Sequence, residues 1–408
     1  MLEPAVIIAA KSINEWYSMF EKQTTPIIGE TKNNEFVQHI LSIIKPEELM
    51  LPSGLKELYT LHCRLFALRS LVTRKTANGV IYDSFIGFHT NTAISILQEA
   101  LRTMFNSGLN ASDYESNIQR LLHETIRYLR IRALSDSPVQ QCYYECYSGL
   151  WTSWVQSEPN LASLYEQELK LLEEAAQQLG DTAYPHALTL AKSVINFYLN
   201  RDEEAFALLR SNKDNWWKND KHLMEFFDWL KANKDWRRLF EWLTALSPLI
   251  NDLRYNSQMR YFEYWDDVVQ HLPAAEAPMW ESLGNISTHF MTIYSDKLYK
   301  YEKWEQWIDL QLSLGEEPLD FRAPELSLIE KHAPDALLPF YHQAVERHLL
   351  TKKRTGYKAA VRLLKRLEKI YKKIKRMDRW EAFMASLIVR YSRYRTLREE
   401  LQKGKLLP

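Results

Sequence analysis

Apolar side chains recur every three or four residues along nearly the whole chain, the spacing that places them on one face of an α-helix. In the first third, the segments with this spacing cover residues 36–44, 55–72, 91–105 and 114–134. Pro46, Pro52 and Gly108 fall between them, where turns are expected. The pattern predicts an all-α protein with an N-terminal helical domain, a bundle over residues 1–135.

The later part of the chain repeats itself. Trp236, Trp304 and Trp380 stand in similar segments, and the spacings between them are 68 and 76 residues. These spacings are close to twice a repeat of roughly 34 to 38 residues, which is typical of stacked helical hairpins. One hairpin cannot bury its apolar face alone, so neighbouring hairpins share a core. We therefore expect an α-solenoid of tetratricopeptide-like hairpins over residues 136–350 and a basic helical segment over residues 351–408 that closes it.

Composition narrows the class of protein. The chain has 408 residues, 46% of them hydrophobic and 12% aromatic, so it can bury a large core. Three cysteines are too few for a disulfide framework and suit a reducing compartment. The apolar run near the start follows Glu3 and lacks a basic region, and no run of 18 apolar residues occurs. We expect a cytoplasmic protein without a signal peptide or a membrane-spanning helix.

The formal net charge is zero, but the charges are unevenly distributed. Residues 351–408 contain 19 Lys and Arg against 5 Asp and Glu, and the first 350 residues carry the matching negative excess. Between Tyr357 and Arg376, Glu368 is the only acidic residue. Because like charges at i, i+4 repel on a helix, such a face indicates a partner that neutralises it.

The candidate binding residues are the cations of this segment and of the turn that follows: Lys358, Arg362, Lys365, Arg366, Lys369, Lys372, Lys373, Arg376, Arg393 and Arg395. Three partners fit them. Nucleic-acid phosphates are one, since the neighbouring Tyr391 and Tyr394 add aromatic side chains to a basic footprint. An acidic protein surface is the second. The third is the acidic remainder of the same chain or of an oligomer mate, and the sequence leaves all three open.

No pattern indicates catalysis, a metal site or a cofactor. Cys142 and Cys146 share a helical face, but zinc takes four ligands and there is no second cysteine pair, so we expect two core residues. His342 and His348 lack the H-E-x-x-H arrangement, and no glycine-rich phosphate loop, dinucleotide loop or nucleophile elbow occurs. Tryptophans could line a ligand groove, although their helical spacing favours core packing: Trp216, Trp217, Trp229 and Trp242. We expect a protein that is not an enzyme.

Four blocks in the later part resemble a known family: "FFDWLKANKDWRRLFEWLTALSPLI", "ALLPFYHQAVERHL", "YKAAVRLLKRLEKIYKKIKRMDRWEAF" and "RTLREELQKGKL". They are similar to the C-terminal region of bacterial SWIM zinc-finger family proteins, over about residues 170–408. The C-x-C and C-x-H zinc motif of that family is absent from this chain, so the finger has been lost or belongs to another subunit. The resemblance implies a bacterial helical-repeat scaffold that works beside a helicase-like ATPase of DNA-acting machinery.

The segment "SINEWYSMFEKQ" at residues 12–23 resembles the opening of Rap-type aspartyl-phosphate phosphatase regulators. That resemblance implies a peptide-sensing regulator in which Gln23 or Gln38 positions water. The leading hypothesis is a non-enzymatic adaptor that holds protein partners on an α-solenoid and contacts DNA or an acidic partner through its basic helix. The alternatives are the Rap-type regulator and a structural subunit without affinity for nucleic acid.

Overall fold

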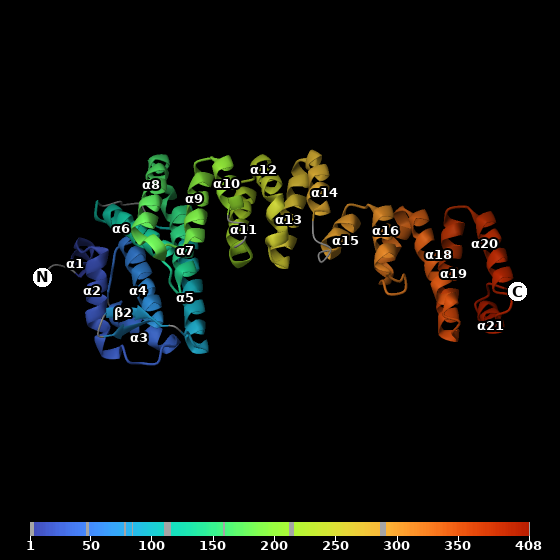
Figure 1. The fold of residues 1–408 in the computed structure, drawn as a ribbon, viewed down its shortest axis with the longest axis horizontal. Coiled ribbons are helices and arrows are strands. Elements are labelled where there is room, and N and C mark those ends of the chain that lie inside the picture. The colour runs from blue at the N-terminus through green and yellow to red at the C-terminus, as the bar shows by residue number, and fades with distance from the viewer. Residues whose placement is uncertain are drawn as a thin grey trace. The chain divides into compact units, whose positions relative to one another are not determined.

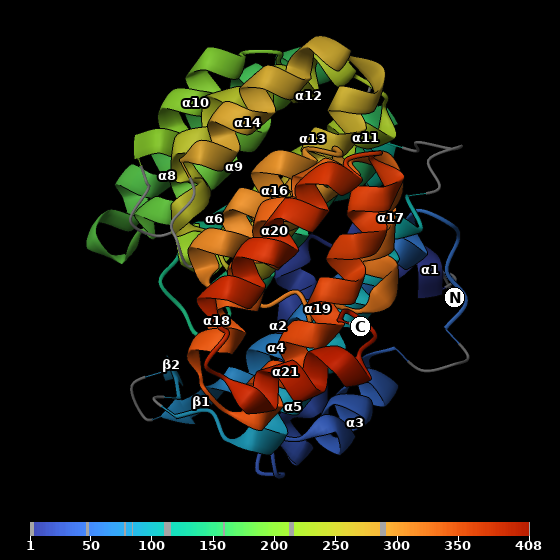
Figure 2. The same cartoon turned by 90° about the vertical axis from the view of Figure 1, so that its right-hand side faces the viewer.

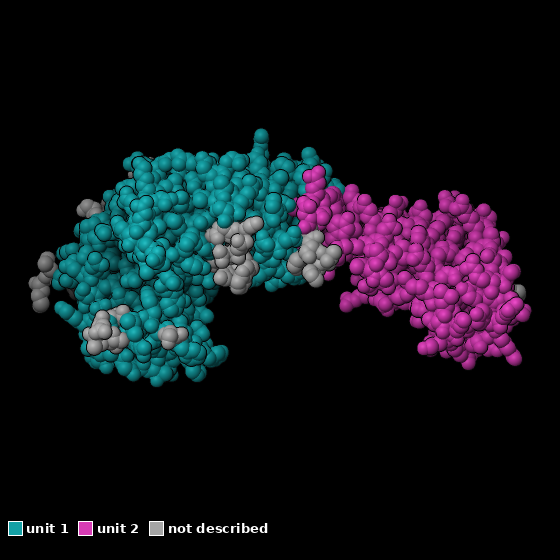
Figure 3. Space-filling view, in the orientation of Figure 1, with its two compact units in different colours: residues 1–279 teal, residues 280–408 magenta. Residues whose placement is uncertain are grey.

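A computed structural model describes residues 4–45, 49–76, 79–83, 85–109, 116–157, 160–211, 216–285 and 291–407. Most of these residues are helical and very few are in strands, which confirms the all-α prediction (Figure 1). They form two compact units, residues 1–279 and residues 280–408 (Figure 3). The division falls inside α14 (Glu276–Gly284). The domain boundaries expected near residues 135 and 350 stay a prediction, as does the tetratricopeptide-like class of the helical array.

Unit 1 contains, in chain order, α1 (Pro4–Ala10), α2 (Ile13–Thr24), α3 (Asn34–Ile44), α4 (Leu55–Val72), β1 (Thr73–Thr76), β2 (Gly79–Tyr82), α5 (Phe88–Asn106), α6 (Ser116–Leu134), α7 (Gln140–Gly149), α8 (Leu161–Leu179), α9 (Pro185–Tyr198), α10 (Asp202–Ser211), α11 (Trp216–Ala232), α12 (Trp236–Leu246) and α13 (Tyr255–His271). The four helical segments predicted in the first third correspond to α3, α4, α5 and α6. The sequence did not predict β1 and β2, which pair antiparallel with Thr73 opposite Tyr82.

Unit 2 contains α15 (Met291–Lys300), α16 (Trp304–Leu314), α17 (Ala323–His332), α18 (Leu337–Leu350), α19 (Arg354–Lys373), α20 (Met377–Arg390) and α21 (Arg395–Lys403). Helix α19 packs along α18 and also contacts α20 and α21 (Figure 2). One apolar core joins these helices, and its fully buried members include Phe340, Tyr341 and Leu367. The basic segment therefore belongs to the core of unit 2 and is not a separate appendage to it.

A recurring backbone turn links helices in both units. The residue two positions before a helix lies in the left-handed region, with φ between 53° and 58°, at Asn200, Lys234, Glu302, Lys352 and Lys375. After Lys234, the Asp235 amide donates to the Leu230 carbonyl at 3.0 Å, which is a Schellman ending of α11. The turn reverses the chain within two residues, so successive helices pack side by side.

This turn corrects one detail of the repeat. Trp236 and Trp304 are each the first residue of a helix, α12 and α16, so they occupy the same position in their helices. Trp380 is the fourth residue of α20, which begins at Met377, so its alignment with Trp236 is wrong by three residues. Trp380 matches Trp307 of α16 instead. Counted from the start of each helix, Trp380 of α20 thus lies three residues later than Trp236 of α12, which sequence spacing alone does not reveal.

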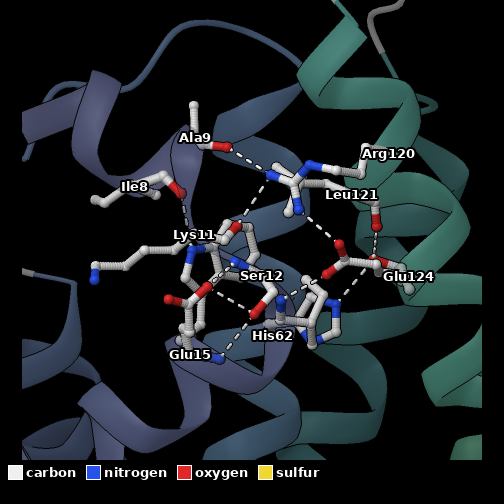
Figure 4. A network of polar contacts seen from close by, with 12 residues as sticks. Ile8, Ala9, Lys11, Ser12, Glu15, His62, Arg120, Leu121 and Glu124 are labelled. Carbon is white, nitrogen blue, oxygen red and sulfur yellow. Dashed lines mark hydrogen bonds and ion pairs between the residues drawn. The ribbon is translucent and has the colours of Figure 1, made fainter.

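Polar contacts tie the first helices of unit 1 to α6 (Figure 4). Glu124 accepts hydrogen bonds from the Ile13 amide at 2.8 Å and from Arg120 at 2.6 Å. Arg120 also donates to the carbonyls of Ala9 at 2.8 Å and Lys11 at 3.2 Å. These bonds satisfy backbone groups that the break between α1 and α2 leaves without helical partners.

His62 of α4 lies at the centre of the same region. Its side chain is fully buried, its ring contacts Trp16, Tyr17 and Tyr128, and Nε2 lies 2.9 Å from Thr125 Oγ1. Burial disfavours the charged imidazolium and lowers the pKa of His62 from 6.5 to about 3. The folded protein therefore holds this histidine neutral.

Replacing Lys234 by Gly should stabilise unit 1 by about 0.5 kcal/mol, because a non-glycine residue in the left-handed region is strained by about 1 kcal/mol or more. Part of that gain is offset by the larger entropy that Gly loses on folding. Urea unfolding of the full chain measures the change. The matched control is Ala232→Gly, at the last residue of α11, which should destabilise by about 0.5–1 kcal/mol. Equal losses in both variants would contradict the assigned turn.

Acid should destabilise unit 1 through His62. Its folded pKa lies below its unfolded value, so its contribution is fully present above pH 6.5 and is lost as the pH falls toward about 3. The expected loss is about 1.4 kcal/mol per pH unit in the steep part of this window. Hydrogen exchange of the α4 amides across the window measures it in the wild type, in His62→Phe and in the exposed control His123→Gln. The dependence should be weaker only in His62→Phe, and equal slopes in all three would refute it.

Candidate nucleic-acid interface

Helix α19 has two sharply different sides. Leu363, Leu364 and Leu367 are fully buried and pack in one core with residues of α18 such as Tyr341 and Val345. Tyr357, Val361 and Tyr371 are buried on the same side, whereas Ile374, just beyond the end of the helix, is half-buried. Between Lys358 and Lys373, every fully exposed position is Lys or Arg.

Five of the predicted cations lie in one row along the exposed side, and we refer to Lys358, Arg362, Lys365, Lys369 and Lys372 as the basic stripe. Their spacings of four, three, four and three residues keep them within roughly 80° of the helix circumference and spread them over roughly 21 Å. The row is straight because the spacing follows the helical period. It is also fixed, since the opposite side of α19 is held in the core.

The basic stripe lacks intramolecular counter-charges. Within the described part of the chain, no carboxylate lies within ion-pair distance of Arg362, Lys365, Lys369 or Lys372, although other cations of unit 2 are paired. Lys358 differs from these four residues, because its charge is close enough to Glu400 to help lower the pKa of that carboxyl group. Four neighbouring positive charges therefore face solvent and repel one another, so the stripe can accept an external polyanion without first breaking a salt bridge.

The other five predicted residues are not part of this row. Arg366 is half-buried and hydrogen-bonds the Tyr341 hydroxyl, while Lys373 donates to the Glu330 carbonyl. Arg376, Arg393 and Arg395 lie at or beside the turns that flank α20, where all three are exposed and Arg395 lies 3.5 Å from Glu399. The structure thus divides the ten candidates into one organised row and five peripheral cations.

Sequence reasoning missed Glu400, which anchors the start of α19. This buried carboxylate on α21 accepts from Arg354 at 2.9 Å and lies 3.6 Å from Lys403. The hydrogen bond from Arg354 lowers the pKa of Glu400. Its position between the buried Leu397 and Leu401 in the helical period of α21 was the available signal.

The cysteines and histidines that were considered for metal binding or catalysis pack against or hydrogen-bond to other residues of the fold. Cys142 and Cys146 are buried and reduced, and the hydrogen bond between the two side chains is the first cause of the raised pKa of Cys146. His342 hydrogen-bonds the Tyr371 hydroxyl at 2.8 Å. Among the described residues, no cluster of three or more His, Cys, Asp or Glu is placed to hold a metal ion. None of the described helices combines the length and apolar character needed to cross a bilayer.

The four tryptophans considered for a ligand groove differ in their burial. Trp242 is fully buried in the core of unit 1, where its ring contacts Phe197 and Phe206. Trp229 is half-buried and lines a cavity. The side chains of Trp216 and Trp217 lie outside the described residues. Core packing is therefore confirmed for Trp242 alone.

Comparison with known proteins gives one partial relative. No model of a known protein family matches the chain. A stretch of 116 residues, which makes up 28% of this chain, is 39% identical to the uncharacterized protein YwqB of Bacillus subtilis (strain 168). The match spans 22% of the length of YwqB, so the chain covers about a fifth of that relative. This similarity assigns neither a family nor an activity, and the resemblance to SWIM zinc-finger proteins stays a prediction.

Replacing Lys365 by Glu should stabilise unit 2 at low salt. The change turns repulsion from Arg362 at i−3 and Lys369 at i+4 into attraction, and turns attraction to Glu368 at i+3 into repulsion, so the net gain is about 0.5–1 kcal/mol. Urea unfolding at low and high salt measures it, and the gain should shrink at high salt because exposed charges are screened. Lys365→Gln should give a smaller gain. A loss of stability in Lys365→Glu would mean that an anionic group already neutralises this position.

Proposed function

We propose that this chain is a non-enzymatic adaptor whose second unit binds the phosphate backbone of nucleic acid along the basic stripe. The observation that carries the proposal is the row of five cations on α19, four of which lack an ion pair within the described residues. Such a row lowers the stability of the fold, and nothing in the packing of α19 requires it. Its retention is explained if an external polyanion neutralises it.

The chemistry of the stripe favours nucleic acid without sequence specificity. Double-stranded DNA carries one negative charge per about 1.7 Å of helix axis, so a row of roughly 21 Å meets several phosphates. Four of the five residues of the stripe are Lys, whose compact head group binds phosphate as a point charge. Contacts of this kind position a protein on a duplex and leave sequence selection to a partner.

The adaptor role adds a protein partner to this contact. The resemblance to SWIM zinc-finger proteins suggests a helicase-like ATPase, which would supply the catalytic activity. In this arrangement unit 2 holds the complex on DNA and the remaining helices hold the partner. An acidic protein on the basic stripe is the competing assignment, and the binding experiment separates the two.

Removing four charges of the basic stripe should weaken binding to DNA and flatten its salt dependence. The variant replaces Arg362, Lys365, Lys369 and Lys372 by Gln, which leaves Arg366 and Lys373 to their contacts within the fold. The affinity of the full chain for a duplex of random sequence is measured by fluorescence anisotropy over a series of salt concentrations. The slope of log affinity against log salt should fall by about 0.9 per lost phosphate contact, and so by roughly three to four.

The matched control removes the same charge elsewhere, at the exposed Lys22, Lys56, Lys170 and Arg237 of unit 1. It should leave the slope unchanged, which separates a local contact from a general effect of net charge. Poly-L-glutamate serves as the second probe. If it binds the stripe as tightly as the duplex at equal charge, the partner is an acidic protein surface. If both quadruple variants bind the duplex like the wild type, the assignment to α19 is wrong.

A further inference from the structure

Unit 1 contains a cavity of about 620 Å³ between α5, α7, α9 and α11. Its apolar wall is formed by residues of α5 and α7, which include Leu101, Phe105, Cys142 and Cys146. This volume falls in the range of about 300–1,000 Å³ that is usual for ligand-binding sites. The basic stripe lies in the other unit, so the cavity is a separate feature of the molecule.

The wall of the cavity has an irregular backbone. After Gly149, α7 continues as a π-helical turn over Leu150–Trp154, and Thr152 and Ser153 of this turn line the cavity. A Cβ atom on residue 149 would lie 2.8 Å from Cγ of Phe105, so only glycine lets the aromatic ring of α5 approach this closely. Turns of the π type are uncommon and occur frequently at functional sites.

The polar lining is mainly acidic. Its charged residues are Glu145, Glu225 and Asp228 against the single cation Arg102. The side chains of Glu225 and Asp228 are 52% and 54% exposed, so their oxygens are accessible to a ligand. These carboxylates already have neighbours: Arg102 lies 3.6 Å from Glu145 and His222 lies 3.3 Å from Glu225, while Asp228 accepts from Arg260 at 3.0 Å and from the Tyr264 hydroxyl at 2.5 Å. A carboxylate can accept about four hydrogen bonds, so acceptor capacity is left.

Aromatic side chains complete the lining. Tyr198 of α9 and Trp229 of α11 meet edge to face, with their ring centroids 5.6 Å apart. Aromatic faces attract Lys and Arg head groups, and this attraction adds to that of nearby carboxylates. An apolar wall beside an acidic and aromatic rim suits a side chain with an apolar stem and a cationic end.

We propose that this cavity binds a short peptide segment of a partner protein through an arginine or lysine side chain. The stem of that side chain packs against Leu101 and Phe105, and its head group lies between Glu225, Asp228 and the rings of Tyr198 and Trp229. The remaining volume accommodates neighbouring residues of the peptide. The inference rests on the adaptor role proposed above and names the chemistry by which the adaptor recognises its protein partner.

The test uses the full chain, fluorescently labelled, and four pools of acetylated and amidated heptapeptides on beads. The central residue is Arg, Lys, citrulline or Glu, and the flanking positions are degenerate. Citrulline has the shape of arginine without its charge. Capture by the Arg and Lys pools should exceed capture by the citrulline and Glu pools at least about fivefold. Equal capture by the Arg and citrulline pools, or capture by none of the four, overturns the proposal.

Two variants locate the binding. Glu225→Gln keeps the size and the acceptor of the side chain and should reduce capture by the Arg pool about fivefold. Glu241→Gln is the matched control, because Glu241 is also 52% exposed and paired but lies on α12 outside the cavity lining. Equal capture of the Arg pool by Glu225→Gln and Glu241→Gln would mean that cationic peptides bind the acidic surface of unit 1 in general. That result overturns the assignment to the cavity.

The affinity of both variants for the DNA duplex is measured in parallel. Lost peptide capture with unchanged duplex binding supports the cavity assignment and leaves the role of the basic stripe intact. Peptide capture that is insensitive to Glu225→Gln, with normal duplex binding, refutes the cavity alone. Failure of duplex binding in the wild type, with peptide capture intact, refutes the nucleic-acid function and leaves the cavity as a peptide site.

Discussion

The apolar contact between α18 and α19 is the interaction on which unit 2 depends. Three leucines of α19 are fully buried there, Leu363, Leu364 and Leu367, and burial of each contributes about 1.5–3 kcal/mol. Repulsion along the basic stripe involves four neighbouring pairs of a few tenths of a kcal/mol each, about 1–2 kcal/mol together. Burial exceeds repulsion, so α19 holds the basic stripe in one fixed geometry although four of its cations have no ion pair within the described residues. The row lowers the stability of unit 2, and the packing of α19 does not require it.

Helix positions followed from the sequence because apolar periodicity reports the buried face directly. The segment predicted at residues 55–72 is found as α4 with the same bounds, and that at 91–105 is found as α5, which begins three residues earlier and ends one later. Charge segregation in the segment 357–376 likewise predicted an exposed basic side. The straight row within this segment could be identified only from the orientation of α19, which places Lys365 and Lys369 on the exposed side and Arg366 beside Tyr341.

Features that depend on contacts between distant segments could not be predicted. The pair formed by Arg130 and Glu168 is buried between α6 and α8, with a separation of 2.7 Å and a further hydrogen bond from Tyr147, although each residue is of a type usually exposed. The cavity of unit 1 draws residues from Gln98 to Trp229. The alignment of Trp380 with Trp236 was also wrong, because left-handed turns set the starts of α12 and α20, and Lys234 and Lys375 carry no mark of that conformation in the sequence.

The two units carry net charges of opposite sign, and this difference separates the ligands of the two proposed binding surfaces. Residues 280–408 carry 25 Lys and Arg against 17 Asp and Glu, whereas residues 1–279 carry 27 against 35. A polyanion is attracted by the stripe and repelled by the carboxylates at the cavity. A cationic peptide experiences the reverse, so neither ligand competes for the other's surface. An adaptor that must hold DNA and a protein together needs this separation, since a chain with uniform charge would bind one class of partner at both places. Under the proposed adaptor role, the zero net charge is the sum of two binding surfaces of opposite sign.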